Sequence, residues 1–280
     1  MLSFLSDFFQ KKKIDLFAPI PLDACRIEKP YLLERVGIKS GTAILLAIPY
    51  FTKACAAPSR NLSAYAVSRD YHLYYAELFG ELLPLLRERF PQNRFAGFAD
   101  HSPICEGEAC VKAGLGVMGK NGLLLTQKYS SYVFLGEIVT DARLPCTLYP
   151  FTVCEDCGAC QRACPLSKGE SVCLSALTQK KGTLSQEEEA YVLQYGSVWG
   201  CDLCQDACPY TKRAIREESI YSPIPFFGEQ AIPCLSSRLL DAMQEDDFRR
   251  RAFSWRGYDT IKRNLTLFER NFETKGESEC

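Results

Sequence analysis

The sequence contains no hydrophobic run long enough to cross a lipid bilayer. Its longest apolar stretch extends from Ala43 to Phe51, well short of the roughly 20 residues that a transmembrane helix needs. The segment Met1–Ile14 has no apolar core of signal-peptide length, and its lysines follow its apolar residues. No twin-arginine export signal is present. We therefore expect a soluble, cytoplasmic protein.

An excess of charge of either sign is also missing. The formal net charge is -1, which argues against a general polyanion binder and against an acidic-tail protein. The hydrophobic content of 47% is that of an ordinary globular protein. A chain of 280 residues is long enough for one or two domains with a large core.

Complete nucleotide-binding motifs are absent. No G-x-G-x-x-G follows a predicted strand, so a nicotinamide site has no support. The stretch GLGVMGKN, from Gly114 to Asn121, lacks both the Ser or Thr after its lysine and the full glycine spacing of a phosphate-binding loop. As a nucleotide motif it is weak.

Cysteine, by contrast, is abundant, with fifteen residues. In a reducing compartment such residues bind metals more often than they form disulfides. A run with the bacterial ferredoxin spacing C-x2-C-x2-C-x3-C-P is formed by Cys154, Cys157, Cys160 and Cys164. A second run, ending at Pro209, has the same pattern with one member missing, and consists of Cys201, Cys204 and Cys208. Two 4Fe-4S clusters need four thiolates each, and Cys173, between the runs, is the natural remaining ligand.

In such double runs the last cysteine of each run binds the cluster of the other. This rule assigns one cluster to Cys154, Cys157, Cys160 and Cys208. It assigns the other to Cys201, Cys204, Cys164 and Cys173. A four-thiolate zinc site is the alternative. Zinc has no need for a triple C-x2-C-x2-C run or for prolines after both terminal cysteines, so the pattern favours two iron–sulfur clusters.

The N-terminal part alternates between helical and strand patterns, which indicates a mixed α/β fold. Helices are predicted for residues 1–13, 70–90 and 107–113, and strands for residues 41–50, 94–100, 121–126 and 130–141. Pro84 is expected to kink or divide the helix over residues 70–90. A further helix is predicted for residues 183–195, with Ser185 and Glu188 as its capping box.

We therefore expect three consecutive domains. Residues 1–145 would form the α/β catalytic domain, residues 146–215 a ferredoxin-like module with two 4Fe-4S clusters, and residues 216–280 an extension that packs on the core. A free ferredoxin would need only the cysteine module, which loops hold around the metal rather than around a large core. The long N-terminal part therefore indicates a catalytic domain in the same chain.

Several sequence blocks, taken in order, resemble the epoxyqueuosine reductase family. They are Asp100, AGLG from Ala113, GKN from Gly119, YSSYVFLGEIVTD from Tyr129, the double cysteine run ending GCDLCQDACP, CLSALTQKKG from Cys173 and SWRGYDTIKRN from Ser254. The resemblance covers nearly the whole chain. The order and spacing of the blocks are specific, whereas only the cysteine run would be specific by itself.

The resemblance implies a cobalamin-dependent oxidoreductase of queuosine biosynthesis, related in architecture to reductive dehalogenases. Members of the family reduce epoxyqueuosine in tRNA to queuosine, with electrons relayed through two 4Fe-4S clusters to a corrinoid. The corrinoid would lie between the α/β domain, residues 1–145 here, and the clusters. In such enzymes the cofactor carries the difficult chemistry and the protein positions it.

The resemblance also implies site residues. The family's catalytic aspartate, which protonates the epoxide oxygen, falls on Asp100, and a partly buried carboxyl with a raised pKa suits that role. Contacts to the corrinoid carry over to Asp100, Leu124, Leu135 and Lys181. From the residues alone, Asp100 is a helix cap as readily as a catalyst, and Leu124 and Leu135 are ordinary strand core. Glu106 is a second acidic candidate, with a surface or capping role as the alternative.

Histidine is scarce, which agrees with a family whose corrinoid lacks a lower histidine ligand. The chain has only His72 and His101, and no D-x-H-x-x-G pattern. Cys105 and Cys110 flank the candidate site, where buried packing thiols are commoner than reactive ones.

Two departures from the family pattern concern the substrate. The chain stops before the helical-repeat extension of longer members, and the block ahead of D-Y-H, Leu62–Tyr65, has no cysteine. Intact tRNA and a smaller queuosine precursor both remain open. A phosphate-facing patch and a solvated helix face are alternatives for the basic residues around Phe253 and Trp255, which are Arg249, Arg250, Arg251, Arg256, Lys262 and Arg263.

We expect a monomer that receives electrons from a ferredoxin or flavodoxin and does not bind membranes. One alternative is a corrinoid iron–sulfur reductase of another substrate, such as an organohalide. The other is a non-catalytic 4Fe-4S electron-transfer protein, which would bind clusters without a corrinoid and would leave the block around Asp100 unexplained.

Overall fold

The structure, a computed structural model, describes residues 1–165 and 173–275, and its contacts divide the chain into two units. Unit 1 comprises Met1–Tyr50, His72–Cys157 and Tyr210–Ile224. Unit 2 comprises Phe51–Tyr71, Gly158–Pro209 and Pro225–Cys280, except that residues 166–172 and 276–280 lie outside the described residues. The units alternate along the sequence and so do not follow the three consecutive domains predicted above. The functions assigned to those domains stay predictions.

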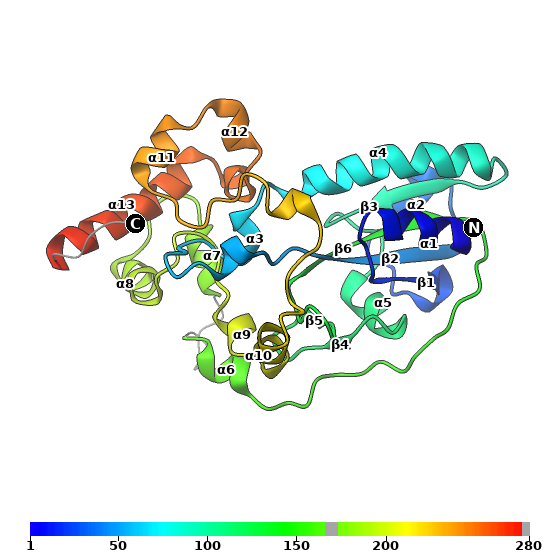
Figure 1. Ribbon diagram of the computed structural model, residues 1–280, viewed down its shortest axis with the longest axis horizontal. Helices are drawn as coiled ribbons and strands as arrows, with labels where there is room; N and C mark the ends of the chain where they lie inside the picture. The colour runs from blue at the N-terminus through cyan, green and yellow to red at the C-terminus, as the bar shows by residue number, and fades with distance from the viewer. Residues whose placement is uncertain (166–172, 276–280) are drawn as a thin grey trace. The chain divides into compact units, whose positions relative to one another are not determined.

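Three of the predicted strands join a fourth, unpredicted strand in a four-stranded antiparallel sheet of unit 1 (Figure 1), whereas the strand predicted for residues 121–126 pairs with β4 (Val117–Met118) in a separate two-stranded sheet. The order of the four-stranded sheet is β1 (Phe17–Pro21), β2 (Thr42–Pro49), β6 (Val133–Thr140) and β3 (Phe95–Phe98). Every residue of β2 is buried, because this strand is paired on both edges and covered on both faces. The predicted doubly buried strand is therefore confirmed.

Helix α4 (Tyr71–Arg89) covers one face of this sheet. Glycines allow its aromatic rings to approach the strands closely: a Cβ atom on Gly136 would lie 2.6 Å from the ring of Tyr75, and one on Gly97 would lie 2.6 Å from the ring of Phe79. The Tyr75 hydroxyl donates a hydrogen bond to the carbonyl of Phe134, at 3.1 Å. These contacts fix α4 over β6 and β3.

The prediction that Pro84 divides this helix is wrong, because α4 continues through it. A proline inside a helix costs about 3 kcal/mol. Leu82 and Leu86, on either side of Pro84, are fully buried, and burial stabilises by roughly 1.5–3 kcal/mol for each such side chain. Packing on the sheet therefore offsets the loss of the backbone hydrogen bond.

Helix α5 (Glu106–Lys112) belongs to the core on the opposite face of the sheet. Ala109, Cys110 and Val111 of α5 pack in one apolar cluster with Leu45 and Val139 of the strands. The remaining elements of unit 1 are α1 (Leu2–Lys11), the 3-10 turn η1 (Leu22–Ala24), α2 (Pro30–Val36), the pair β4 (Val117–Met118) and β5 (Leu124–Leu125), and α10 (Pro209–Arg216). As predicted, α1 is amphipathic, and it buries Leu5, Phe8 and Phe9.

In the part of unit 2 that the structure describes, the named elements are helices and 3-10 turns. Its elements are η2 (Lys53–Ala56), α3 (Ala64–Val67), α6 (Ala159–Ala163), α7 (Leu174–Thr178), α8 (Gln186–Tyr195), α9 (Leu203–Asp206), η3 (Pro225–Phe227), α11 (Ser237–Ala242), α12 (Glu245–Arg249), η4 (Ala252–Arg256) and α13 (Tyr258–Lys275). Helix α13 contacts α7, α8 and α11 (Figure 1). The predicted capping box is confirmed, since Ser185 and Glu188 exchange hydrogen bonds at the start of α8. Among the helices described, none is both long and apolar enough to cross a membrane.

Candidate functional site

A cavity of about 250 Å³ in unit 1 brings together several residues singled out from the sequence. Asp100, Glu106, Leu124 and Leu135 all line it. They come from the loop after β3, the first turn of α5, β5 and β6, so the cavity lies where these four elements meet. We call it the Asp100 cavity.

Asp100 itself is more exposed than expected. Its carboxyl is 70% exposed, and one oxygen lies 3.8 Å from Nε2 of His72. The backbone of Asp100 adopts a left-handed conformation with φ of 63°, which aspartate tolerates better than most residues do. The expectation of a partly buried Asp100 carboxyl is therefore wrong for this structure, because the left-handed turn leaves the side chain in solvent.

A buried carboxyl is nevertheless present at the Asp100 cavity, in Glu106. This side chain is half-buried at the start of α5 and lies within hydrogen-bonding distance of Glu137. The pKa of Glu106 is raised to about 7, chiefly by burial; the hydrogen bond with Glu137 lowers it and the negative charge of Asp100 raises it. Glu106 is therefore not a freely exposed side chain, and its role stays a prediction.

The sequence analysis missed Glu137, which has no exposed surface. It lies in the middle of β6, opposite Leu45 of β2 and Phe98 of β3. The Ser102 hydroxyl donates a hydrogen bond to its Oε1 atom, at 2.6 Å. Burial raises the pKa of Glu137 well above its usual range, and the charge of Glu106 adds to the effect. The signal that could have revealed it is a lone acidic residue inside the apolar run YVFLGEIVT.

The two cysteines near this cavity differ in their surroundings. Cys110 is fully buried in the apolar cluster, and burial raises the pKa of its thiol well above the usual value. It is a packing residue, as expected. Cys105 lines the cavity, and its sulfur accepts a hydrogen bond from the Arg26 guanidinium at 2.8 Å.

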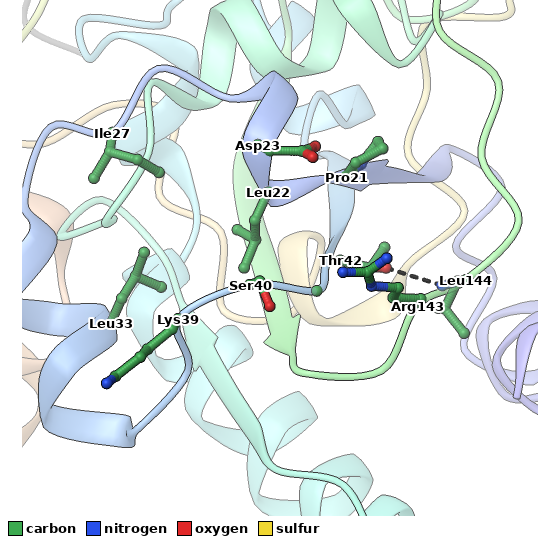
Figure 2. A pocket seen from close by; sticks show the side chains of 11 residues that line it. Pro21, Leu22, Asp23, Ile27, Leu33, Lys39, Ser40, Thr42, Arg143 and Leu144 are labelled. Carbon is green, nitrogen blue, oxygen red and sulfur yellow. Dashed lines mark hydrogen bonds between the residues drawn. The ribbon is translucent and has the colours of Figure 1, made fainter.

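A second cavity in unit 1, of about 410 Å³, contains none of the predicted site residues (Figure 2). Leu22 and Leu33 line it together with the charged residues Asp23, Lys39 and Arg143.

The first cysteine of the ferredoxin-like run is attached to β4. The backbone N–H of Cys154 donates to the carbonyl of Met118 at 2.9 Å, and Val153 forms a β-bridge with the same residue. Lys120, in the stretch considered as a phosphate loop, forms an ion pair with Asp156 at 2.6 Å. This stretch therefore supports the cysteine run.

In unit 2 the second half of the first cysteine run packs against the second run. Helix α6 carries Cys160 and ends at Cys164, and it contacts α9, which carries Cys204. Burial raises the pKa of the Cys201 thiol to about 12, and the neighbouring Asp202, Cys173 and Cys204 add to the effect. The sequence assigned Cys164, Cys173, Cys201 and Cys204 to one cluster, and all four belong to this unit.

The ligand set assigned to the other cluster is divided. Cys154 and Cys157 belong to unit 1, whereas Cys160 and Cys208 belong to unit 2. The four assigned ligands of this cluster therefore do not lie within one unit. Within the described residues, no group of three or more His, Cys, Asp or Glu side chains is arranged to hold a metal ion. The ligand assignments therefore stay predictions.

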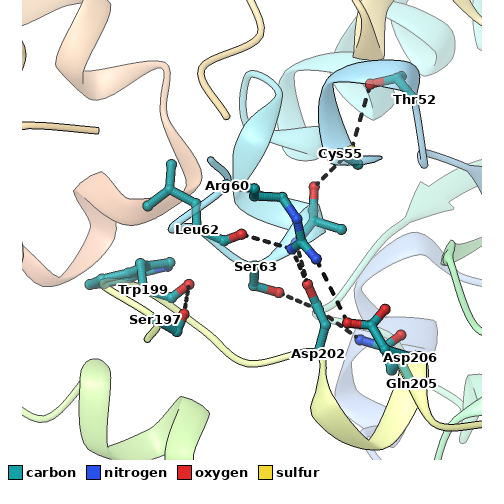
Figure 3. A network of polar contacts seen from close by, with 11 residues as sticks. Thr52, Cys55, Arg60, Leu62, Ser63, Ser197, Trp199, Asp202, Gln205 and Asp206 are labelled. Atoms are coloured by element: carbon teal, nitrogen blue, oxygen red, sulfur yellow. Dashed lines mark hydrogen bonds and ion pairs between the residues drawn. The ribbon is translucent and has the colours of Figure 1, made fainter. Parts of the chain in front are cut away.

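A polar network around Asp202 holds the loop between Cys201 and Cys204 (Figure 3). The Asp202 side chain is 3% exposed. Its carboxyl accepts hydrogen bonds from Ser63 Oγ at 2.6 Å, from the backbone of Ala64 at 2.7 Å and from Gln205 Nε2 at 3.1 Å, and it pairs with Arg60. Neither Asp202 nor Arg60 was recognised from the sequence, because 142 positions separate them.

Lys181 lies in unit 2, in an open cavity of about 750 Å³ that Cys173 also lines. Trp255 and Arg256 form another wall, with the guanidinium 3.6 Å from the centre of the indole ring. Trp255 is 56% exposed. The structure thus places Lys181 in a different unit from Asp100, Leu124 and Leu135.

The basic residues near the C-terminus do not all face solvent. Arg251 is buried and donates to the carbonyl of Gln230 at 2.7 Å. Arg263 donates to the carbonyls of Lys180 and Gly182, at 2.6 and 2.5 Å. These two arginines hold unit 2 together, so a phosphate-facing patch of all six residues does not form.

Known proteins similar to the chain are epoxyqueuosine reductases. The enzyme of Listeria monocytogenes is 30% identical over 268 residues, which cover 89% of this chain and 70% of that protein. The enzyme of Gloeobacter violaceus is 34% identical over 189 residues, which cover 64% of this chain and 59% of that protein. No protein-family model matches the chain.

Solved structures show the same fold. Epoxyqueuosine reductase from Streptococcus thermophilus matches with a TM-score of 0.78 and 22% identity, covering 98% of this chain and 84% of that one. An epoxyqueuosine reductase solved with an epoxyqueuosine-modified tRNA-Tyr stem loop matches with a TM-score of 0.73 and 24% identity, covering 97% and 82%. The extended sequence match and this shared fold identify the chain as a member of the epoxyqueuosine reductase family of oxidoreductases.

Proposed function

We propose that the chain reduces epoxyqueuosine to queuosine with cobalamin, using electrons relayed through two 4Fe-4S clusters. The observation that carries the proposal is the Asp100 cavity. The residues that the family resemblance assigns to proton donation and to corrinoid contact, Asp100, Leu124 and Leu135, come from separate elements yet line the same cavity.

The residues present fit the implied cofactors. Leu124 and Leu135 offer an aliphatic wall of the cavity that suits contact with a corrin ring. The eight cysteines assigned as ligands, seven from the two runs together with Cys173, supply the four thiolates that each of two 4Fe-4S clusters needs. When bound, cobalamin would supply the reductive chemistry at carbon, and the clusters would supply electrons one at a time.

Asp100 would donate a proton to the epoxide oxygen as the carbon–oxygen bond breaks, because an alkoxide is a poor leaving group until it is protonated. Its exposure does not argue against this role, since catalytic contacts often form only when substrate is bound. A related Bacillus subtilis epoxyqueuosine reductase has been solved with its catalytic aspartate loop swung out of the active site. We propose that the Asp100 loop closes in the same manner, with His72 as its polar neighbour.

We propose tRNA as the substrate, supported by the relative that was solved with a modified tRNA stem loop. A ferredoxin or flavodoxin would deliver the electrons. The cytoplasmic location and the monomeric state remain predictions from the sequence.

The test is anaerobic reconstitution of the chain with iron, sulfide and cobalamin, followed by metal analysis and an absorbance spectrum. We expect about eight irons and one retained cobalt per chain, and conversion of an epoxyqueuosine-modified stem loop under reducing conditions. Iron without retained cobalt would favour an electron-transfer protein instead. Zinc in place of iron would overturn the proposal, and full cofactor loading without conversion would point to another substrate.

A further inference from the structure

Glu106 lines the Asp100 cavity and interacts with the buried carboxyl of Glu137, and the proposed function leaves both groups without a role. Glu137 lies on a sheet face that is otherwise apolar, since residues two apart on a strand share a face and its neighbours there are Leu135 and Val139. Burying a carboxyl in such surroundings is unfavourable unless it is protonated or paired. Its placement therefore needs a reason.

The hydrogen bonds around the pair leave room for a shared proton. Ser102 Oγ accepts from the backbone of Ile104 at 3.1 Å and donates to Glu137 Oε1 at 2.6 Å. Oε1 of Glu106 and Oε2 of Glu137 are buried and accept no hydrogen bond from the described residues. Two adjacent carboxylates cannot both be ionised at low cost. A proton held between the two carboxyls removes one of the two negative charges. It also allows a hydrogen bond between the two side chains.

The other charged groups that face the pair do not neutralise two negative charges. Glu28 and Asp100 add negative charge, and Lys29 is the cation with the largest effect on both carboxyls. The Lys29 ammonium lies 3.2 Å from Nδ1 of His101. Tyr75 of α4 lies on the other face of the sheet and is a neutral phenol, because burial raises the pKa of its hydroxyl well above its usual value. Cys110 is likewise a neutral thiol.

The proposed reaction, on which this inference rests, needs two protons. An epoxide becomes an alkene when both carbon–oxygen bonds break and the carbon–carbon double bond forms. The oxygen leaves as water, so the change consumes two electrons, supplied by a low-potential one-electron donor protein, and two protons. Asp100 delivers one proton per turnover, and a second donor must serve the same oxygen.

We infer that Glu106 is this second donor and that Glu137 resupplies its proton. Glu106 lines the cavity together with Asp100, so it can reach the substrate oxygen, whereas Glu137 lies behind it on β6. Glu106 is then a catalytic residue. Glu137, held by Ser102, is a positioning residue that keeps a proton within reach of Glu106.

The first test measures protonation without turnover, by infrared titration of the reconstituted protein. We expect one protonated-carboxyl band to disappear with a midpoint at about pH 7 and a second to persist at higher pH. Glu106→Gln should remove the first band and Glu137→Gln the second. Glu108→Gln is the matched control on α5, because Glu108 pairs with Arg26 and Lys112, and it should change neither band.

If both bands survive in both variants, or if the wild type shows no protonated carboxyl above pH 6, the pair holds no proton and the inference fails. Circular dichroism and iron content establish that each variant is folded. Should Glu137→Gln not fold, Glu106→Gln decides the question alone.

The second test measures turnover of an epoxyqueuosine-modified stem loop at saturating substrate. Glu106→Gln should lower kcat by about 10²-fold or more, as for loss of a general acid, with little change in KM. The fall in turnover rate of the wild type above about pH 7 should be absent in this variant. Glu106→Asp should recover part of the rate. An unchanged rate and pH profile would overturn the donor role. If the wild type shows both infrared bands but reduces no epoxyqueuosine, the proposed function fails and the donor role with it, while the proton-sharing pair stands.

Discussion

At the scale of single residues, the acidic side chains of the Asp100 cavity differ in burial. Asp100 is exposed beside His72, whereas Glu106 and Glu137 are withdrawn from solvent. A carboxyl donates a proton near neutral pH only if its surroundings disfavour the charged form. Burial provides this at Glu106.

Asp100→Asn tests the first proton donor. The variant should retain both clusters, because Asp100 is exposed and lies outside the cysteine runs. It should lose turnover by about 10²- to 10⁴-fold, the usual contribution of a general acid. Asp23→Asn, at the other cavity of unit 1 (Figure 2), is the control and should remain active. Unchanged turnover in Asp100→Asn would end its proposed role.

Glu106 should also make stability depend on pH. Its pKa is raised from 4.5 to about 7, so between these values the folded state holds a proton that the unfolded state has released. The contribution of Glu106 to the free energy of unfolding is therefore greatest below pH 4.5 and falls as pH rises towards 7, by up to about 3 kcal/mol. Urea unfolding across this range should show the fall in the wild type, and Glu106→Gln should reduce it. Parallel curves for the two proteins would contradict the raised pKa.

At the scale of elements, short helices and loops hold the cysteines in place. Helix α6 packs on α9, and the start of α7 places Cys173 near Cys201. Asp202 holds the loop from Cys201 to Cys204. Its carboxyl pairs with Arg60 and accepts a hydrogen bond from Ser63, and both of these residues lie in the connection between η2 and α3. Contacts between protein residues within unit 2 therefore help to position the thiols of that unit.

Cys173→Ala should lower iron content by up to one cluster, about four irons per chain. The reason is that Cys173 is the remaining thiolate for the cluster assigned to Cys164, Cys201 and Cys204. Cys146→Ala, outside the runs, is the control and should load fully. Iron analysis and an absorbance spectrum after reconstitution measure both. Full occupancy in Cys173→Ala would mean that another residue completes the set.

Asp202→Asn should destabilise unit 2 by roughly 3 kcal/mol, because it removes the buried charge that pairs with Arg60 and accepts hydrogen bonds from Ser63 and Ala64. Asp206→Asn is a matched control: Asp206 also faces Arg60, but at 3.7 Å and with a side chain that is 47% exposed. Its loss should change stability by less than about 1 kcal/mol. Denaturant unfolding of the two variants measures the difference. Equal effects would show that the network around Asp202 is not what stabilises the loop.

At the scale of the whole molecule, charge does not suggest strong non-specific binding to nucleic acid. The net charge is -1, and Arg251 and Arg263 are used inside unit 2. Attraction to phosphate is therefore a smaller part of substrate recognition than the count of arginines suggests.

The salt dependence of stem-loop binding tests this view. We expect affinity for an epoxyqueuosine-modified stem loop to fall by less than about 10²-fold between 50 and 200 mM salt, whereas many phosphate contacts give a loss of 10³-fold or more. Fluorescence anisotropy at several salt concentrations measures the slope. An unmodified stem loop is the control. A steep slope, equal for both RNAs, would show that a larger basic surface is used.

The sequence by itself determined the features that depend on local spacing. The cysteine runs, the amphipathic helix α1, the doubly buried strand β2 and the capping box of α8 each lie within a short segment, where the periodicity of side chains or the reach of a cap decides the structure. The positions that line the Asp100 cavity could be anticipated only through the family resemblance, residue by residue.

Only the tertiary structure decided how distant residues meet. Sheet register places Glu137 opposite Leu45 and Phe98 and beside Glu106, and packing carries α4 through Pro84. The Arg60–Asp202 pair likewise joins two loops far apart in the sequence. Burial and electrostatic coupling depend on distances in space, which local patterns of residue type do not contain, so the pKa values of the cavity's carboxyls followed from the fold.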